Sequence, residues 1–263
     1  MTQKFGSFIW YELMTDDAGR VGPFYEAVAG WTVSPGDPAA PIDYRHIGRA
    51  DGGANGGILQ LTPEMQAAGA HPAWVPYLHV ADVDSAVAEI EADGGRQLMA
   101  KTTIPEGSFA MVTDPMGTPF YVMSPVPPPG KPDAKSDVFS VSEAGHMRWN
   151  ELASPDQARA KDFYARHFGF EFNNSMPMGE MGDYCFIEHN GTVLGAIMRQ
   201  QPGQPPLWVP YIGVTSAEAA RRAIEANGGK VLNGPHQVPG GEWVVQAEDP
   251  AGARFGVVGP KGD

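Results

Sequence analysis

Two glutamates stand at the same place in two similar stretches of this sequence. Glu12 follows Trp10 in Trp-Tyr-Glu-Leu, and Glu151 follows Trp149 in Trp-Asn-Glu-Leu. A carboxylate among aromatic side chains is costly to desolvate unless it is paired or protonated. Each glutamate could anchor a ligand, act as a general base or be a displaced metal ligand; alternatively, it bonds backbone amides or an arginine. Because the residue recurs, we favour a shared structural role over catalysis, with ligand binding by at least one glutamate close behind.

His79 is the candidate partner of Glu12 in proton transfer, since the ordinary pKa of histidine lies near 6.5. The alternative, which we prefer, is a hydrogen-bonded histidine in a pocket or at its rim. His46 has a weaker case, because the face of its strand is not fixed by the sequence. A shifted metal site of Glu12, His79 and either His46 or Gln60 stays an alternative. The other histidines lack ligand spacing, and we expect them at the surface: His71, His146, His167, His189 and His236.

These residues belong to a duplicated sequence. Seven residues recur 139 positions later: Gly6, Trp10, Glu12, Leu13, Phe24, Tyr25 and Gly30 correspond to Gly145, Trp149, Glu151, Leu152, Phe163, Tyr164 and Gly169. Trp-Val-Pro-Tyr at 74–77 recurs at 208–211, and Asp114-Pro-Met-Gly recurs as Asp249-Pro-Ala-Gly. Such ordered matches predict tandem domains. We place them at 1–125 and 144–263, joined by a Pro-rich linker at 126–143.

The elements that must position these residues follow from periodicity and from caps. In the first copy we expect strands at 8–14, 44–48, 57–61, 75–80, 109–113 and 119–123. A helix should start at Asp16 or Asp17 and end before Gly30, and a second helix should cover 82–93 before Gly94. In the second copy, Ser154-Pro-Asp-Gln should supply the N-cap, a proline at the first helical position and a capping-box glutamine. Strands are expected there at 184–188 and 193–198, so that each copy is β-α-β-β-β twice over.

Composition restricts the class of partner. The net charge of −13 disfavours nucleic acid and anionic membranes as partners. A single cysteine, Cys185, allows no intramolecular disulfide and no thiolate metal cluster. No signal peptide is visible, and no run approaches the roughly 20 apolar residues of a membrane helix. We expect a cytoplasmic monomer or homodimer that binds a small molecule.

The duplicated motifs resemble the vicinal oxygen chelate superfamily, which includes glyoxalases, bleomycin resistance proteins and dioxygenases. The resemblance rests on Trp10-Tyr-Glu-Leu with Phe24-Tyr25 and Gly30, on Trp149-Asn-Glu-Leu with Phe163-Tyr164 and Gly169, and on the two Asp-Pro-x-Gly turns. Among its members the chain is most similar to the two-domain bacterial type of mycobacterial antigens. The resemblance implies an α+β fold in which each domain is two βαβββ modules that form a curved, partly open barrel around a concave pocket.

Metal-dependent members of that superfamily hold their ion with residues on the first, fourth, fifth and eighth strands, usually His, Glu or Gln. The resemblance places Trp10, Gln60, Val75 and Tyr121 there in copy one and Trp149, Met198, Val209 and Gly256 in copy two. Trp, Val and Gly side chains offer no lone pair to zinc or iron. We therefore expect no cofactor and keep a divalent metal as the minority alternative.

Strand alternation indicates which side chains share a face with Trp10 and Trp149. In copy one the expected ligand-binding residues are Trp10, His46, Gln60, Tyr77 and Tyr121, with Phe8 beside them. In copy two they are Trp149, Glu151, Met198 and Tyr211, together with Phe186. Gly213 and Gly256 replace His79 and Tyr121, so copy two should be more apolar. The three methionines of 173–183 are typical of an adaptable lid, although an ordinary mobile loop fits equally well.

Four functions stay open. We favour a metal-independent protein that binds a small, partly aromatic or apolar molecule, with acid/base chemistry by Glu12 and His79 as an addition. A metal-dependent lyase, isomerase or dioxygenase is the first alternative. A non-catalytic binder of drugs or metabolites is the second, and a scaffold with filled pockets is the third.

Overall fold

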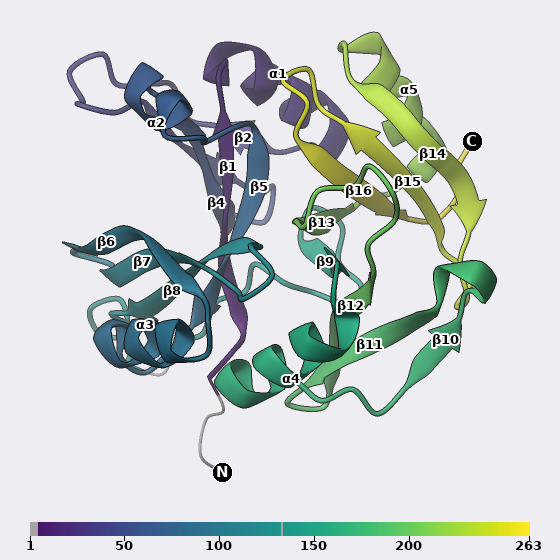
Figure 1. Cartoon of the computed structure of the whole chain (residues 1–263). Coiled ribbons are helices and arrows are strands. Elements are labelled where there is room, and N and C mark those ends of the chain that lie inside the picture. The colour runs from purple at the N-terminus through teal and green to yellow at the C-terminus, as the bar shows by residue number, and fades with distance from the viewer. Residues whose placement is uncertain (1–4, 133) are drawn as a thin grey trace. The chain divides into compact units, whose positions relative to one another are not determined.

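The structure is a computed structural model that describes residues 5–132 and 134–263. The first repeat, purple to teal in Figure 1, contains two β-α-β-β-β modules joined by a short helix, α2 (Pro63–Ala67). The first module is β1 (Phe8–Thr15), α1 (Ala18–Ala29), β2 (Thr32–Val33), β3 (Tyr44–Gly48) and β4 (Ala54–Gln60). The second is β5 (Ala73–His79), α3 (Val83–Ala92), β6 (Arg96–Ile104), β7 (Gly107–Thr113) and β8 (Pro119–Pro125).

The second repeat, green to yellow in Figure 1, has the same order. Its first module is β9 (Met147–Ser154), α4 (Gln157–Phe168), β10 (Ser175–Pro177), a 3-10 turn η1 (Gly179–Met181), β11 (Asp183–His189) and β12 (Thr192–Arg199). Its second is β13 (Trp208–Gly213), α5 (Ala217–Ala226), β14 (Lys230–Gln237), β15 (Trp243–Glu248) and β16 (Arg254–Gly259). The α+β fold of tandem modules predicted from the repeat is confirmed.

Each repeat forms one eight-stranded mixed sheet. The strand orders are β2-β3-β4-β1-β5-β8-β7-β6 and β10-β11-β12-β9-β13-β16-β15-β14. The first strand of every module runs parallel to the last strand of that module, as in β1 beside β4 and β5 beside β8, while hairpin neighbours are antiparallel. The opening strand of each module therefore lies inside the sheet, where its side chains have neighbours on both sides.

The ends of the first helix of each repeat are set by caps. Asp17 accepts the backbone N–H of Arg20 at 3.0 Å, and Gly30 ends α1 in the left-handed region, as predicted. In the second repeat the prediction of Ser154 as N-cap is wrong, because Ser154 is still the last residue of β9. Asp156 caps α4 instead by accepting the N–H of Arg159 at 3.0 Å.

The chain packs as two compact units that differ from the two repeats. Unit 1 joins the described residues up to Trp10 with Pro76–Ser136 and Asn150–Trp208. Unit 2 joins Tyr11–Val75, Asp137–Trp149 and Val209–Asp263. Each unit thus combines a module of one repeat with a module of the other, and the two units are described separately below.

A buried chain of hydrogen bonds links the two repeats inside unit 2. The indole N–H of Trp74 donates to the Tyr25 hydroxyl at 2.9 Å, and that hydroxyl donates to Asp249 Oδ2 at 3.1 Å. Burial raises the pKa of Tyr25 well above its ordinary value, so the hydroxyl keeps the proton that it donates. Phe255 packs edge-on against Tyr25 with ring centroids 5.3 Å apart. Helix α1 of copy one is thereby held against strands of copy two.

Unit 1 contains the reciprocal arrangement. The Trp208 indole N–H donates to the Tyr164 hydroxyl at 3.1 Å, and Tyr164 donates to Asp114 Oδ2 at 3.3 Å. Phe120 packs against the rings of Tyr164 and Phe168. Trp74 and Trp208 are both buried, and each is linked through a tyrosine to an aspartate of the other repeat.

The second half of the segment predicted as a linker is packed in unit 2. Arg49 forms an ion pair with Asp137 at 2.6 Å. Just after this segment, the backbone oxygen of Gly145 accepts from the Asn55 amide at 2.6 Å and from the Trp31 indole at 2.7 Å. This part of the chain is therefore fixed by side chains of copy one rather than freely extended.

Some predicted surface positions are wrong. His189 is 3% exposed, and the side chains of His167 and His146 expose 7% and 11%. Phe8 does not join the predicted pocket lining, because its ring packs against Trp208 and Phe170 at 5.4 and 6.0 Å in unit 1. Among the described residues, no helix combines the length and the apolar character needed to span a membrane.

Candidate functional site

Strands β9, β12 and β11 of unit 1 present a mixed polar and aromatic face. Glu151 lies directly opposite Ala196, which lies opposite Phe186 on the far strand. Directly opposed residues share a face of a sheet. By the same register the Glu151 face comprises Glu151, Ala196, Met198, Tyr184 and Phe186. The alternate residues point to the core beside α4 and are buried: Leu152, Ile197 and Cys185.

A short hydrogen bond organises the Glu151 face. The Tyr184 hydroxyl donates to Glu151 Oε2 at 2.6 Å, within the usual range for an O–H group on a carboxylate. Phe186 stands edge-on to Tyr184 with ring centroids 5.9 Å apart. Glu151, Tyr184 and Phe186 are all partly exposed. Ala196 lies between Glu151 and Phe186 in the register, and its side chain is fully buried.

The equivalent face of copy one, on β1, β4 and β3 of unit 2, is filled differently. Glu12 is opposite Gly57, and Gly57 is opposite His46. A Cβ atom at Gly57 would lie 2.1 Å from Tyr44 Cζ, so the Tyr44 ring covers this glycine. Glu12 is only 4% exposed, whereas His46 is exposed with its ring 5.4 Å from that of Tyr44. The two predicted glutamates thus have different surroundings.

Gln60 serves the helix next to it. Its Oε1 accepts the Ala18 N–H at 2.8 Å, and its Nε2 donates to the Asp16 carbonyl at 2.7 Å. Both polar atoms of the amide are engaged by the backbone at the start of α1. The ligand-binding and metal-binding alternatives for Gln60 would require breaking these bonds, so we assign it a positioning role for α1.

An aromatic cluster lies on β5, β8 and β7 of unit 1. Tyr77 and Tyr121 are opposed in register and stack with centroids 4.1 Å apart, and Phe109 packs against both. His79 follows on the same face, edge-on to Phe5 at 5.0 Å. Burial lowers the pKa of His79 below its ordinary 6.5, so its ring is neutral at pH 7. Glu12 belongs to unit 2 and His79 to unit 1, and their action as an acid/base pair stays a prediction.

Copy two has a different cluster at the equivalent place, on β13, β16 and β15 of unit 2. The Tyr211 ring lies over Gly256, where a Cβ would be 2.2 Å from Tyr211 Cδ1, and its hydroxyl accepts from Gln246 Nε2 at 2.6 Å. Trp149 packs against the same cluster. Beside Gly213, where copy one has His79, lies the stem of Arg148. Its guanidinium pairs with Glu242 at 2.8 Å.

Sequence reasoning missed Tyr184, Gln246 and Arg148. Strand alternation was a signal for Tyr184, because it is two residues before Phe186 on the same strand. Gln246 lies in a strand of copy two that the sequence predicted only by analogy with copy one. Arg148 is adjacent to Trp149, so strand alternation assigns its side chain to the face opposite that of Trp149. Its aliphatic part fits beside residue 213 because that residue is a glycine.

The residues at the superfamily's metal positions do not fit a divalent ion. Val75 is fully buried, Gln60 is bound to backbone, and Gly256 lies under a tyrosine ring. Across residues 5–132 and 134–263, His, Cys, Asp and Glu side chains form no group of three or more that could hold a metal. These observations concern the donor set alone. Metal-independence therefore stays a prediction.

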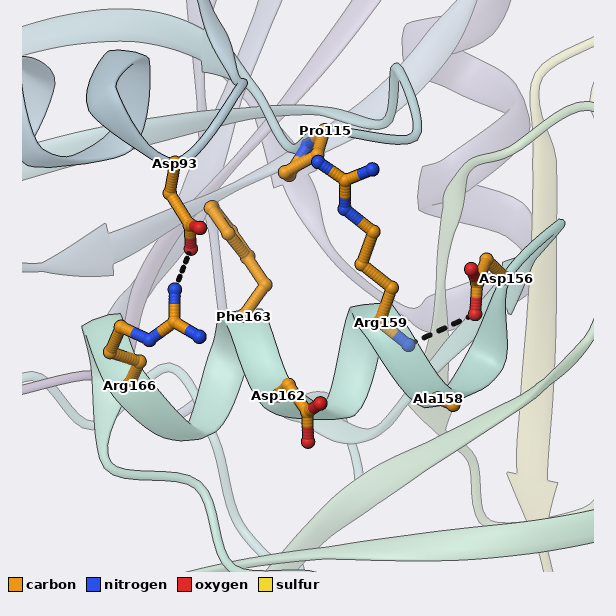
Figure 2. Close-up of a pocket in the computed structure, with 8 residues that line it drawn as sticks. All are labelled: Asp93, Pro115, Asp156, Ala158, Arg159, Asp162, Phe163 and Arg166. Atoms are coloured by element: carbon orange, nitrogen blue, oxygen red, sulfur yellow. Dashed lines mark hydrogen bonds and ion pairs between the residues drawn. The ribbon is translucent and has the colours of Figure 1, made fainter.

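A separate pocket of about 250 Å³ lies where α4 meets the end of α3 in unit 1. Figure 2 shows Arg166 reaching Asp93, at 2.5 Å, and Arg159 extending toward Pro115. His167 also contacts Asp93, at 3.0 Å, and with Arg166 it holds the pKa of this aspartate below its ordinary value against the opposing effect of burial. These groups join helices of different repeats, which indicates a structural role.

Arg159 supports this assignment. Its guanidinium lies 3.1 Å from where a Cβ of Gly94 would be, at the C-terminal end of α3. Its counterpart in copy one, Arg20, lies 3.5 Å from the same point at Gly228, after α5. A cation is favourable beside the carbonyl end of a helix. Because the arrangement recurs in both units, we attribute it to the fold rather than to a ligand.

Comparison with known proteins gives matches along nearly the whole chain. Residues 144–257 match the model described as Glyoxalase/Bleomycin resistance protein/Dioxygenase superfamily, and residues 11–123 match a glyoxalase-like domain. The chain is 26% identical over 253 residues to "Putative glyoxylase CFP32" of Mycobacterium tuberculosis, covering 95% of this chain and 94% of that protein. It is 30% identical over 128 residues to the anthracycline biosynthesis protein DnrV of Streptomyces peucetius, covering 43% of this chain and 46% of that protein.

Solved structures share the fold. A substrate complex of homoprotocatechuate 2,3-dioxygenase from Brevibacterium fuscum has a TM-score of 0.68 at 18% identity, covering 97% of this chain and 81% of that one. The Mn(II)-bound glyoxalase from Novosphingobium aromaticivorans has a TM-score of 0.64 at 16% identity, covering 99% and 83%. At such identities the likeness concerns the fold and not the reaction.

Proposed function

We propose that this chain, which belongs to the glyoxalase/bleomycin resistance protein/dioxygenase superfamily, binds a small, partly aromatic organic molecule on the Glu151 face without using a divalent metal. The observation that carries the proposal is the 2.6 Å hydrogen bond from Tyr184 to Glu151 on a face with a partly exposed phenyl ring. Small-molecule sites in proteins are mostly apolar and aromatic, with a few well-placed polar groups.

The difference between the copies supports copy two as the binding copy. In copy one the ring of Tyr44 covers Gly57, and Glu12 is buried. In copy two the corresponding Ala196 carries a methyl group, and Tyr184 is bonded to a glutamate that is partly exposed. Glu151 is therefore partly in contact with solvent, whereas Glu12 is only 4% exposed.

The relatives agree with an aromatic ligand. One of them takes part in anthracycline biosynthesis by its name, and a structural neighbour is described as a dioxygenase in complex with 3,4-dihydroxyphenylacetate. Phe186 and Tyr184 offer faces on which a planar ring stacks, and Glu151 accepts a hydrogen bond from a hydroxyl or amine of that ligand. Tyr184 keeps the carboxylate in one orientation while this happens.

Isothermal titration with 2-naphthylmethanol and 1,4-dihydroxyanthraquinone tests the proposal. We expect wild-type protein to bind at least one of them, and Glu151→Gln and Tyr184→Phe to weaken binding by roughly tenfold, which is the effect of losing one hydrogen bond to a charged group. Glu225→Gln is the matched control, since it removes an exposed carboxylate of α5 that pairs with Arg221.

Two outcomes would contradict the proposal. If Glu12→Gln abolishes binding while Glu151→Gln leaves it unchanged, the ligand binds in copy one. If binding requires added Mn²⁺ or Fe²⁺ and disappears with a chelator, the metal-dependent alternative holds. Binding that is equal with and without chelator supports metal-independence.

A further inference from the structure

We propose that Asp93, Arg166 and His167 form a selective contact that directs helix α4 of copy two to helix α3 of copy one rather than to helix α5 of its own repeat. The proposal concerns the assembly of unit 1 and is independent of the proposed ligand site. It is carried by an ion-pair cluster that joins the two repeats within unit 1, while the equivalent positions of unit 2 hold uncharged side chains.

The contacts that both units share cannot make this choice. The chain of hydrogen bonds from tryptophan through tyrosine to aspartate occurs in each unit with equivalent residues. Arg159 lies beside Gly94 in unit 1, as Arg20 lies beside Gly228 in unit 2. If α4 packed beside α5, Tyr164 and Arg159 would meet an aspartate and a glycine of the same kind as they meet now. Only residues that differ between the units can distinguish the two pairings.

The cluster is such a difference. Asp93 Oδ2, at the C-terminal end of α3, lies 2.5 Å from Arg166 Nη1 and 3.0 Å from His167 Nε2, and both of these residues belong to the last turn of α4. The side chain of His167 is 7% exposed, and its ring packs on that of Phe163 with centroids 4.6 Å apart. In the alignment of the repeats, the three equivalent residues of unit 2 are Asn227, Ala27 and Val28.

Asp93 depends on this contact more than its partners do. It caps the carbonyl end of α3, where a negative charge is unfavourable and a cation is favourable. Asn227, the equivalent cap of α5, is uncharged, and its amide donates to the Ala223 carbonyl of its own helix at 2.8 Å. Burial raises the pKa of Asp93, but the bonds from His167 and Arg166 lower it more, so that the carboxylate is ionised at pH 7.

The alternative pairing would lose these interactions on both sides. With α1 beside α3, Asp93 would face the uncharged side chains of α1 at the carbonyl end of its own helix. With α4 beside α5, Arg166 and His167 would face Asn227. Separating the partners of a partly buried ion pair costs free energy on each side. Specificity is the difference between the free energies of two pairings, so the cluster adds to the preference for the pairing observed.

A double-mutant cycle at residues 93 and 166 tests the contact itself. Urea unfolding of the full chain at pH 7 compares wild type, Asp93→Asn, Arg166→Ala and the double variant. We expect a coupling of roughly fivefold in the folding equilibrium constant, because one pair is partly exposed and the carboxylate stands at a helix end. The cycle of Asp93→Asn with Ala27→Arg is the control. It should show no coupling, because residue 27 belongs to α1 of unit 2.

Transplanting the cluster to unit 2 tests its selectivity. Asn227→Asp puts a carboxylate at the carbonyl end of α5 and should lower the folding equilibrium constant roughly two- to fivefold. Ala27→Arg, at an exposed position of α1, should have little effect alone and should restore most of the loss when it is combined with Asn227→Asp. Arg166→Ala should change the stability of Asn227→Asp by the same factor as that of wild type, since Arg166 belongs to unit 1.

The couplings between residues 93 and 166 and between residues 227 and 27 must therefore exceed those of the two crossed cycles. Equal coupling in native and crossed cycles would show that the charges do not discriminate between helices. Absence of coupling between residues 93 and 166 would overturn the inference as well. Positions 27 and 227 are exposed, so these variants test it even if substitution of the buried His167 prevents folding. None of the measurements involves a ligand, so the proposed function is tested separately.

Discussion

At the scale of single residues, two glycines determine where two tyrosine rings lie in unit 2. Tyr44 covers Gly57, and Tyr211 covers Gly256, with ring atoms 2.1 and 2.2 Å from where a Cβ would stand. In copy one Tyr121 occupies the position of Gly256 and stacks on Tyr77 instead. The difference between tyrosine and glycine at this position therefore accompanies a stacked pair of rings in copy one and a single ring over the glycine in copy two.

Substitution of Gly256 by alanine should displace the Tyr211 ring. The added methyl group overlaps the ring, and inserting a methyl into a packed place costs about 1–3 kcal/mol. Urea unfolding of Gly256→Ala should show this loss. In a Tyr211→Ala background the same substitution should cost much less, because the overlap is gone. An equal cost in both backgrounds would show that the ring does not rest on Gly256.

His79 should titrate below its ordinary pKa of 6.5, because burial disfavours the charged ring. NMR titration, with His79→Gln to assign the resonance, measures this value directly. A pKa depressed by folding means that the unfolded chain binds the proton more readily. The contribution of His79 to stability is therefore present above pH 6.5 and is lost as the pH falls through the folded-state pKa. A midpoint above 6.5 would contradict this prediction.

The candidate site was partly predictable at this scale. Alternation placed Glu151, Phe186 and Met198 on one face, and the strand register confirms that they share it. That they bind a ligand stays a prediction. The orientation of Gln60 toward α1 could not be predicted, because it depends on two backbone groups that only the folded turn brings within reach.

At the scale of elements, the strands with a buried face were predicted within a few residues, and the exposed ones were not. The strand β3 was predicted with its observed bounds at 44–48. The nine-residue strand β6 was missed, since it is exposed along nearly its whole length and alternation of apolar residues is absent. Its pairing with β7 also contains two register shifts, which no sequence pattern announces.

Helix caps provide a prediction at the element scale. Replacing Asp156 by alanine removes the acceptor for the Arg159 N–H and should cost about 1 kcal/mol, the usual value for an N-cap. Asp17→Ala should cost α1 a similar amount, because its side chain makes the same bond to Arg20. Asp156→Asn, which keeps an acceptor oxygen, is the control. Urea unfolding that shows Asp156→Ala and Asp156→Asn to be equally stable would contradict the assignment.

At the scale of the whole molecule, the duplication was visible in the sequence but the pairing of its modules was not. Tyr25 and Tyr164 are equivalent in the repeat, as are Asp249 and Asp114, so each tyrosine has a chemically identical aspartate available in either copy. In the structure, each of these two tyrosines donates a hydrogen bond to the aspartate of the other copy. Because the two aspartates are equivalent in the repeat, sequence motifs do not show which aspartate each tyrosine bonds. Only the folded structure shows it.

The pairing of each tyrosine with the aspartate of the other copy has a measurable consequence for local stability. Tyr164→Phe in copy two removes the hydroxyl that joins Trp208 to Asp114, at a cost of about 1–3 kcal/mol for buried groups left without a partner. Because unit 1 includes strands of copy one, hydrogen exchange should accelerate in β7 and β8, by up to roughly a hundredfold for amides that exchange through opening of the unit.

The reciprocal variant makes the test decisive. Tyr25→Phe in copy one should accelerate exchange in β15 and β16 of copy two, because Tyr25 bonds Asp249 and packs on Phe255. If each substitution instead accelerates exchange only within its own repeat, the repeats open independently and the paired modules are not the cooperative units. If Tyr164→Phe accelerates exchange in copy one and Tyr25→Phe accelerates it in copy two, each unit is stabilised by the tyrosine of one copy and the aspartate of the other.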